Sequence, residues 1–267
     1  MCRTCGCSAE ENSEPISYRH DHTGEHVHDH AHGHEHGPRT EGTVVLPLAQ
    51  RVLERNDELA ADNRRRLLTA GIFAVNLMSG PGAGKTTLLE RTLRDLGSDL
   101  EISVIEGDQA TDHDAARIRA AGGRAIQINT GAGCHLDAAM VARALDELDP
   151  ARGSVVVIEN VGNLVCPALF DLGERAKVVV VSVTDGDDKP LKYPHMFRAS
   201  DLMLLNKIDL LPHVRFDPDH CLAYARAVNP RLQVLHVSAT QGDGLRGWYG
   251  WLRERAVERR MGAAIST

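Results

Sequence analysis

The stretch Ser79-Gly80-Pro81-Gly82-Ala83-Gly84-Lys85-Thr86 decides the fold that we predict for this chain of 267 residues. It follows the apolar run Ile72–Met78, which predicts a buried strand, and it leads into a helical pattern over Thr86–Leu96. Its glycines allow backbone amides to face an anion, while the lysine and threonine side chains supply a positive charge and a hydroxyl group. A strand, a glycine-rich turn and a helix in this order predict a phosphate-binding loop of the Walker A kind, with Ser79 where the strict pattern has glycine.

The chain beyond this loop continues the same alternation. Short apolar runs alternate with helical stretches, which predicts a largely parallel sheet covered by helices on both faces. We therefore expect an α/β fold of the P-loop NTPase class over residues 43–267. The runs expected as strands are Ile72–Met78, Ile102–Ile105, Ala125–Ile128, Ser154–Ile158, Lys177–Val183, Leu202–Leu205 and Gln233–Val237. The helical stretches include Leu46–Ala70, Thr86–Leu96, His135–Leu148 and Pro218–Val228.

Residues 1–42 have a different composition. Eight histidines fall between His20 and His36 among acidic residues and glycines, and almost nothing in this segment is apolar. Such a segment buries too little surface to offset its ordering entropy, so we expect a disordered tail. Its imidazoles would bind divalent metal at neutral pH, although a polar linker without a metal role is the alternative.

Three thiols stand at the beginning of this tail. Cys2, Cys5 and Cys7 lie within six residues, close enough to converge on one ion, and the terminal amine could supply a fourth donor. Three thiolates and a nitrogen suit Ni²⁺ in a square plane and equally Zn²⁺ in a tetrahedron. Incidental cysteines in an unstructured tail are the alternative, which we disfavour because exposed thiols are seldom kept without a use. We expect a metal-binding tail.

Charge and hydropathy exclude several classes of partner. A net charge of −7 gives no electrostatic reason to expect nucleic acid or an anionic membrane. Apolar runs such as Val178–Val181 are far too short to cross a bilayer, and the N-terminus lacks the apolar segment of a signal peptide. We therefore expect no nucleic acid, no membrane insertion, and a cytoplasmic location in which the six cysteines stay reduced.

Two later motifs indicate which nucleotide the loop serves. Asn206-Lys207-Ile208-Asp209 closes a predicted strand, and the carboxylate of Asp209 would accept hydrogen bonds from guanine N1–H and from its exocyclic amine. Adenine has no donor at N1, so the same site would leave a carboxylate unpaired, at a cost of about 1–3 kcal/mol. The stem of Lys207 would lie along the base, and Ser238-Ala239-Thr240 follows the next strand with backbone amides for the guanine oxygen. The order of these motifs favours GTP over ATP.

The residues between these motifs carry the expected catalytic groups. Glu159 can reach Mg²⁺ through water, Thr86 can ligate the same ion, and the amide of Gly162 can meet the γ-phosphate. Asp108, in Glu106-Gly107-Asp108-Gln109, is the candidate for positioning Mg²⁺ or the attacking water, with a helix or turn cap as the alternative. The expected catalytic set is Lys85, Thr86, Asp108 and Glu159. The expected nucleotide-binding set is Gly80, Pro81, Gly82, Ala83, Gly84, Lys85, Thr86, Thr87, Gly162, Asn206, Lys207, Asp209, Ser238 and Ala239.

Three further residues have side chains that could hold a metal. Cys134 and His135 lie at the start of a predicted helix, where the helix dipole favours a thiolate, and Cys166 lies four residues beyond Gly162. Taken one by one, a buried small side chain or a hydrogen-bonded histidine is the more ordinary interpretation. Residue types alone leave both possibilities open.

Five strings together resemble HypB, the family of GTPases that insert nickel during the maturation of [NiFe]-hydrogenase. The resemblance implies an internal metal site at Cys134, His135 and Cys166 besides the N-terminal one, and Ni²⁺ delivery with Mg²⁺ and GTP. It also implies a homodimer in the GTP-bound state, a nickel metallochaperone as partner and the hydrogenase large subunit as recipient. The strings are Met1-Cys2-x-x-Cys5-Gly6-Cys7, Ser79 to Thr87, Asn129 to Asp137, Glu159 to Pro167 and Gly186 to Pro194.

Two other interpretations stay open at this stage. A urease-maturation GTPase also delivers nickel, but there a Cys-Pro-His element is expected, and here Cys166-Pro167 is followed by Ala168. A metal-storage protein with a regulatory nucleotide domain would bind much nickel and turn over little GTP. The joint presence of Lys85, Thr86 and Glu159 argues against an inactive nucleotide site.

Overall fold

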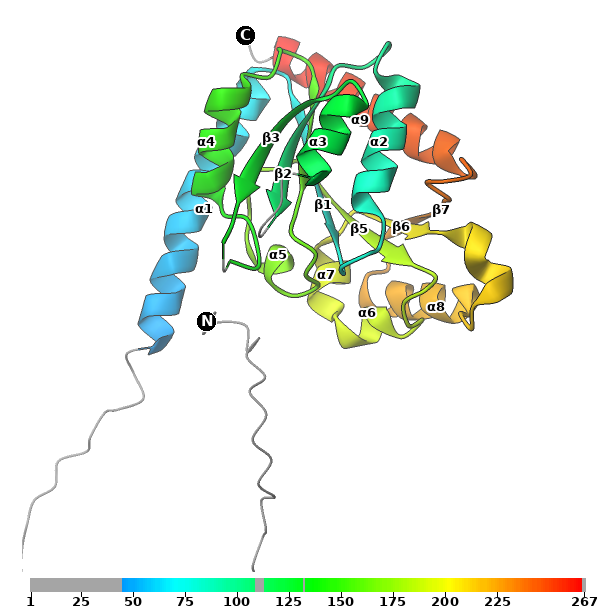
Figure 1. Ribbon diagram of the computed structural model, residues 1–267. Coiled ribbons are helices and arrows are strands. Elements are labelled where there is room, and N and C mark those ends of the chain that lie inside the picture. The colour runs from blue at the N-terminus through cyan, green and yellow to red at the C-terminus, as the bar shows by residue number, and fades with distance from the viewer. Residues whose placement is uncertain (1–44, 109–112, 132, 266–267) are drawn as a thin grey trace, which may run out of the picture.

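A seven-stranded sheet forms the centre of the molecule (Figure 1). The computed structural model describes residues 45–108, 113–131 and 133–265. All neighbouring strands pair in parallel, in the order β3-β2-β4-β1-β5-β6-β7. The α/β fold with a parallel sheet is therefore confirmed. The strands are β1 Phe73–Ser79, β2 Ile102–Asp108, β3 Arg124–Asn129, β4 Val155–Glu159, β5 Ala176–Ser182, β6 Leu202–Asn206 and β7 Gln233–His236.

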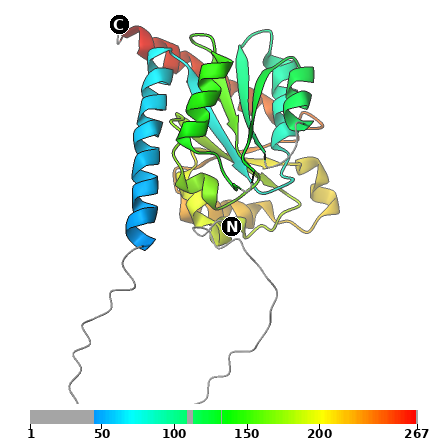
Figure 2. The same ribbon diagram turned by 60° about the vertical axis from the view of Figure 1, so that its left-hand side comes forward.

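Helices cover both faces of this sheet, as Figures 1 and 2 show. One core packs α2 and α9 against the face of β1 that carries Phe73, Val75 and Leu77. The opposite face carries Ala74 and packs against α1 and α4, which lie side by side. The helices are α1 Val45–Thr69, α2 Lys85–Leu96, α3 His113–Ala120, α4 Ala138–Leu148, α5 Cys166–Leu169, α6 Lys189–Lys192, α7 Pro194–Ala199, α8 Pro218–Val228 and α9 Leu245–Ile265, with the 3₁₀ helix η1 at Ile208–His213.

Two elements differ from their predicted bounds by three residues, and the other predicted strands and helices agree to within one residue at each end. Strand β2 extends past Ile105 to Asp108 because backbone pairing with β3 continues through Gly107, although the apolar run has ended. Helix α4 begins at Ala138 rather than His135, since Asp137 is its N-cap and its carboxylate accepts a hydrogen bond from the amide of Met140 (2.7 Å). The loop before α4, rather than its first turn, therefore carries His135.

The N-terminal predictions lie outside the described residues. They comprise the disordered tail over residues 1–42, its histidines and the thiols of Cys2, Cys5 and Cys7. Within the described part of the chain, no helix is both long enough and apolar enough to span a bilayer.

Candidate functional site

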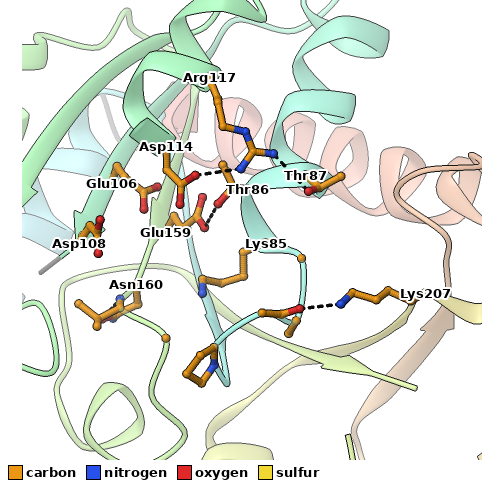
Figure 3. Close-up of a pocket in the computed structure, with 17 residues that line it drawn as sticks. Lys85, Thr86, Thr87, Glu106, Asp108, Asp114, Arg117, Glu159, Asn160 and Lys207 are labelled. Carbon is orange, nitrogen blue, oxygen red and sulfur yellow. Dashed lines mark hydrogen bonds and ion pairs between the residues drawn. The ribbon is translucent and has the colours of Figure 1, made fainter. Parts of the chain in front are cut away.

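A cavity of about 520 Å³ lies at the carboxyl ends of β1, β2 and β4 (Figure 3). This is where parallel α/β sheets place their ligands, because the loops that leave neighbouring strands diverge there. The glycine-rich loop forms one wall, and the ends of β2 and β4 form the other. Many of the residues predicted from the sequence line this cavity: Pro81, Gly82, Ala83, Gly84, Lys85, Thr86, Thr87, Asp108, Glu159, Gly162 and Lys207.

The glycine-rich loop has the backbone that its sequence requires. Gly82 and Gly84 adopt φ values of 72° and 94°, a left-handed conformation that side chains with a Cβ rarely adopt. Lys85 opens helix α2, and its Nζ donates to Ser79 Oγ (3.0 Å). The serine that departs from the strict pattern is thus the partner of the lysine in this structure. Both groups are buried, so the ammonium group is positioned before any phosphate arrives.

Three carboxyl groups converge on the other wall. Oxygen atoms of Glu106, Asp114 and Glu159 all lie within 4.8 Å of one another, and Thr86 Oγ1 donates to Glu159 Oε1 (2.8 Å). Burial and the neighbouring Glu159 raise the pKa of Glu106 to about 11. Burial also raises the pKa of Glu159, while the charge of Lys85 opposes that shift.

This acidic group fits a hard divalent cation. The Oε2 atoms of Glu106 and Glu159 are buried and accept no hydrogen bond from a described donor. Oxygen atoms from carboxylates and a threonine hydroxyl are the donors that Mg²⁺ prefers, and a cation between them would offset their repulsion. The residues that would hold it are Thr86, Glu159, Glu106 and Asp114.

Two of these residues were not predicted from the sequence. Glu106 stands in the motif from which we selected Asp108, and Asp114 lies in the first turn of α3, a helix that we did not predict. Arg117, one turn further along α3, holds Asp114 through Nη1 (2.9 Å) and also pairs with Glu90 (3.0 Å). Asp108 is half-buried and lines the cavity. The only signal for Glu106 was a second carboxylate two residues away in the same string.

The residues predicted to recognise guanine meet the glycine-rich loop at its far side. Asn206 Nδ2 donates to the Ala83 carbonyl (2.9 Å), and its Oδ1 accepts from the amide of Ala239 (3.1 Å). Lys207 Nζ donates to the Gly82 carbonyl (2.7 Å), which Figure 3 shows as a dashed line. Oδ1 of Asp209 is buried and accepts no hydrogen bond from a described donor.

A second cluster unites Cys134, His135 and Cys166. The two sulfur atoms are 3.0 Å apart, and Cys134 Sγ lies 3.6 Å from His135 Nδ1. The His135 ring stacks on Phe170 with the ring centroids 3.9 Å apart. Burial lowers the pKa of His135, which favours the neutral imidazole that binds metals. Two sulfurs and an imidazole are soft-to-intermediate donors that suit nickel or zinc.

A short segment joins the two sites. Gly162 packs against the glycine-rich loop so closely that a Cβ added there would lie 3.0 Å from Pro81 Cα. Four residues later the chain reaches Cys166, the first residue of α5. The segment between them is turned by Asn163, whose Oδ1 accepts from the amide of Val165 (2.8 Å). Residues 162–166 therefore run directly from the cavity to the cluster of Cys134, His135 and Cys166.

Comparisons with known proteins give consistent results. Residues 74–236 match the family described as "CobW/HypB/UreG, nucleotide-binding domain". The hydrogenase maturation factor HypB of Rhizobium leguminosarum bv. viciae is 58% identical over 222 residues, which span 83% of this chain and 74% of that protein. The crystal structure of HypB from Archaeoglobus fulgidus has a TM-score of 0.72 and 41% identity, covering 76% of this chain and 100% of the other. HypB from Helicobacter pylori, crystallised in complex with nickel, has a TM-score of 0.72 and 37% identity, covering 77% and 97% of the two chains.

Proposed function

The chain belongs to the HypB family of hydrogenase maturation factors, and from that premise we propose that it hydrolyses GTP with Mg²⁺ to control the delivery of nickel to a [NiFe]-hydrogenase. One observation carries this proposal. The segment that leaves the nucleotide cavity at Gly162 enters the cysteine–histidine cluster at Cys166. A γ-phosphate bound at one end can therefore alter ligand geometry at the other.

Hydrolysis is assigned to the groups that line the cavity. Lys85 would balance the charge of the β- and γ-phosphates, and Thr86 and Glu159 would hold the metal with Glu106 and Asp114. Bound Mg²⁺ would supply the positive charge that stabilises the phosphate oxygens as they gain charge. Asp108 orients the attacking water from the rim of the cavity.

Base selection is assigned to the motif after β6. The carboxylate of Asp209, of which Oδ1 is buried and accepts no hydrogen bond from a described donor, would accept two hydrogen bonds from guanine. Adenine would leave it unpaired, which penalises ATP. Lys207 would lie along the base, and the Ser238-Ala239 loop would meet the guanine oxygen with its amides.

Nickel is the cargo of the internal cluster. Cys134, His135 and Cys166 supply three donors, and a relative of 37% identity was crystallised with nickel. The remaining position is open to a donor from a second copy of the chain in a GTP-bound homodimer or from a nickel metallochaperone that exchanges the ion. Zn²⁺ is the competing occupant, because the same donors suit a tetrahedral ion.

A second nickel site is proposed at Cys2, Cys5 and Cys7 in a metal-binding tail over residues 1–42. Thiolate ligands require a reducing compartment, which favours the cytoplasm, where the hydrogenase large subunit would receive the ion. Removing residues 1–7 should eliminate one tight nickel site per chain and leave the internal site intact. An unchanged nickel stoichiometry after this truncation would rule out the N-terminal site.

The proposed function is tested by measuring nucleotide turnover and bound nickel on the same samples. The Thr86→Ala variant should lose Mg²⁺-dependent GTP turnover and keep its nickel, whereas Cys166→Ser should lose one nickel and keep its fold. ATP in place of GTP, and chelation of Mg²⁺, are the matched controls. Equal turnover of ATP and GTP, or full nickel binding by Cys166→Ser, would contradict the proposal.

A further inference from the structure

Leu136, which follows His135 directly, is wedged against the wall of the nucleotide cavity. Its side chain is fully buried and lies on the backbone of Gly107. A Cβ added to Gly107 would come within 2.8 Å of Leu136 Cγ, closer than side chains approach one another in proteins. Gly107 stands between Glu106 and Asp108 at the end of β2, so the leucine rests on the strand segment that carries two of the cavity's acidic groups.

The backbone of Leu136 contacts the neighbouring strand end as well. Its amide donates to Asn160 Oδ1 (3.3 Å), the residue that follows Glu159 in the cavity wall, labelled in Figure 3. The same oxygen accepts from the amide of Val161 (3.0 Å), and Asn160 Nδ2 donates to Asn76 on β1 (3.3 Å). A single buried carboxamide is therefore shared between the cavity wall and the loop that carries the cluster.

The chain after Leu136 is held in place. The amide of Ala138 donates to Asn56 on α1 (2.9 Å), and its carbonyl accepts from Asn63 on the same helix (2.8 Å). On the other side, the amide of Thr130 donates to the Asp108 carbonyl (2.9 Å) and so ties the start of the loop to β2. Because α1 fixes the segment beyond Leu136, a push on Leu136 from the cavity wall has to be taken up by the residues before it, which are Cys134 and His135.

We propose that Leu136 is a positioning residue that transmits the nucleotide state from the ends of β2 and β4 to the cysteine–histidine cluster. This inference rests on the proposed function and adds a second connection to the one through Gly162. Bound Mg²⁺ and phosphate would draw Glu106 and Glu159 together and thereby shift Gly107 and Asn160, the two groups that Leu136 contacts. A metal–ligand bond tolerates displacements of only a few tenths of an ångström, so a small movement of the Leu136 backbone changes the affinity of the cluster for metal.

The test measures a coupling ratio, which is the nickel affinity with a non-hydrolysable GTP analogue divided by the affinity with GDP. The full-length chain is used with serine at positions 2, 5 and 7, and the thiolate-to-nickel charge-transfer band reports nickel held by Cys134 and Cys166. A ratio differing from one by about 5- to 150-fold in either direction is typical of coupled sites. A substitution that weakens nickel binding equally in the GTP-analogue-bound and GDP-bound states leaves the ratio unchanged. A general loss of stability therefore does not alter the ratio.

Three variants and a control separate coupling from folding. Leu136→Ala removes the packing on Gly107, Asn160→Ala removes the shared acceptor, and Gly107→Ala pushes on the leucine without deleting it. Leu145→Ala is the matched control because Leu145 is equally buried in the same apolar cluster, on a helix that contributes no described residue to the nucleotide cavity.

We expect Leu136→Ala and Asn160→Ala to bring the coupling ratio at least about fivefold closer to one. We expect Leu145→Ala to keep the coupling ratio of the parent protein. We expect Gly107→Ala to change the ratio as well, so this variant tests the role of Leu136 even if Leu136→Ala fails to fold. A parent ratio well away from one that persists in all three variants would overturn the role of Leu136 while leaving the proposed function intact. A parent ratio of one would overturn the nucleotide control of nickel itself, and this inference with it.

Discussion

Asn206 links the glycine-rich loop to the loop that carries Ala239, and its removal has a calculable cost. The side chain is 1% exposed, donates to the Ala83 carbonyl (2.9 Å) and accepts from the amide of Ala239 (3.1 Å). The Asn206→Ala substitution would leave a buried carbonyl and a buried amide without these partners. Each such loss costs about 1–3 kcal/mol, and a water molecule entering the vacated space would recover part of it. We therefore expect the free energy of unfolding to fall by about 2–4 kcal/mol.

Nucleotide affinity should fall as well, because Ala83 belongs to the phosphate-binding loop and Ala239 to the loop proposed to meet guanine. A misalignment that costs about 1.4 kcal/mol of binding weakens the affinity for GDP tenfold, and we expect at least that loss. Urea unfolding measures the first effect, and equilibrium titration with a fluorescent GDP analogue measures the second.

Asn229→Ala is the matched control for this prediction. Asn229 Nδ2 donates to the carbonyls of Phe197 (3.0 Å) and Ser200 (2.9 Å), and none of these residues lines the nucleotide cavity. The control should lose stability and keep its affinity for GDP. If Asn206→Ala also bound GDP as tightly as the parent protein, the inference that Asn206 aligns the two loops for nucleotide binding would be refuted.

Three further substitutions test individual groups of the cavity. Lys85→Ala should abolish GTP hydrolysis and leave the fold and the nickel stoichiometry unchanged, which turnover assays and circular dichroism would check. Asp209→Asn should lose affinity for GTP and gain affinity for xanthine nucleotides, because their C2 carbonyl would face the new amide donor. Competition binding measures this change, and an unchanged affinity for GTP would exclude a contact between Asp209 and the base. Glu106→Gln should stabilise the metal-free protein against urea by up to about 3 kcal/mol at pH 7. The reason is that the pKa of Glu106 is raised in the fold, so its carboxyl group takes up a proton when the chain folds at pH 7. This uptake costs about 1.4 kcal/mol for each pH unit above the ordinary pKa of 4.5, and glutamine avoids that cost. That gain should vanish as the pH falls below 4.5, and its absence at pH 7 would mean that Glu106 is not protonated in the metal-free fold.

The fold could be predicted closely from the sequence because the buried strands of a parallel sheet have a strong apolar signal. Strand β6 was predicted as Leu202–Leu205 and extends one residue further, to Asn206. The error at β2 was larger, since the apolar run stops at Ile105 while backbone pairing continues to Asp108. Hydrogen bonding between strands depends on the partner strand, which the residue types of β2 alone do not show.

The candidate site was predictable where one contiguous motif builds it. The glycine-rich loop and the motif around Asn206 line or border the cavity as their sequences indicate. The acidic group was only half predicted, because Asp114 reaches Glu106 through the packing of α3 beside the end of β2. Nothing in the local sequence around Asp114 indicates that approach, which only the tertiary arrangement creates.

The central claim is that one chain binds both nucleotide and nickel, and that each ligand changes the affinity for the other. The most direct test is the effect of nickel on the preference between GDP and a GTP analogue. Coupling between two sites is reciprocal, so nickel must change the ratio of GDP affinity to GTP-analogue affinity by the same factor by which the nucleotide changes nickel affinity. The measurement is this affinity ratio in the full-length chain with serine at positions 2, 5 and 7, with nickel and after its removal by a chelator. We predict that nickel changes the ratio by about 5- to 150-fold, and that the Cys166→Ser variant shows no such change. An identical ratio with and without nickel would contradict the account.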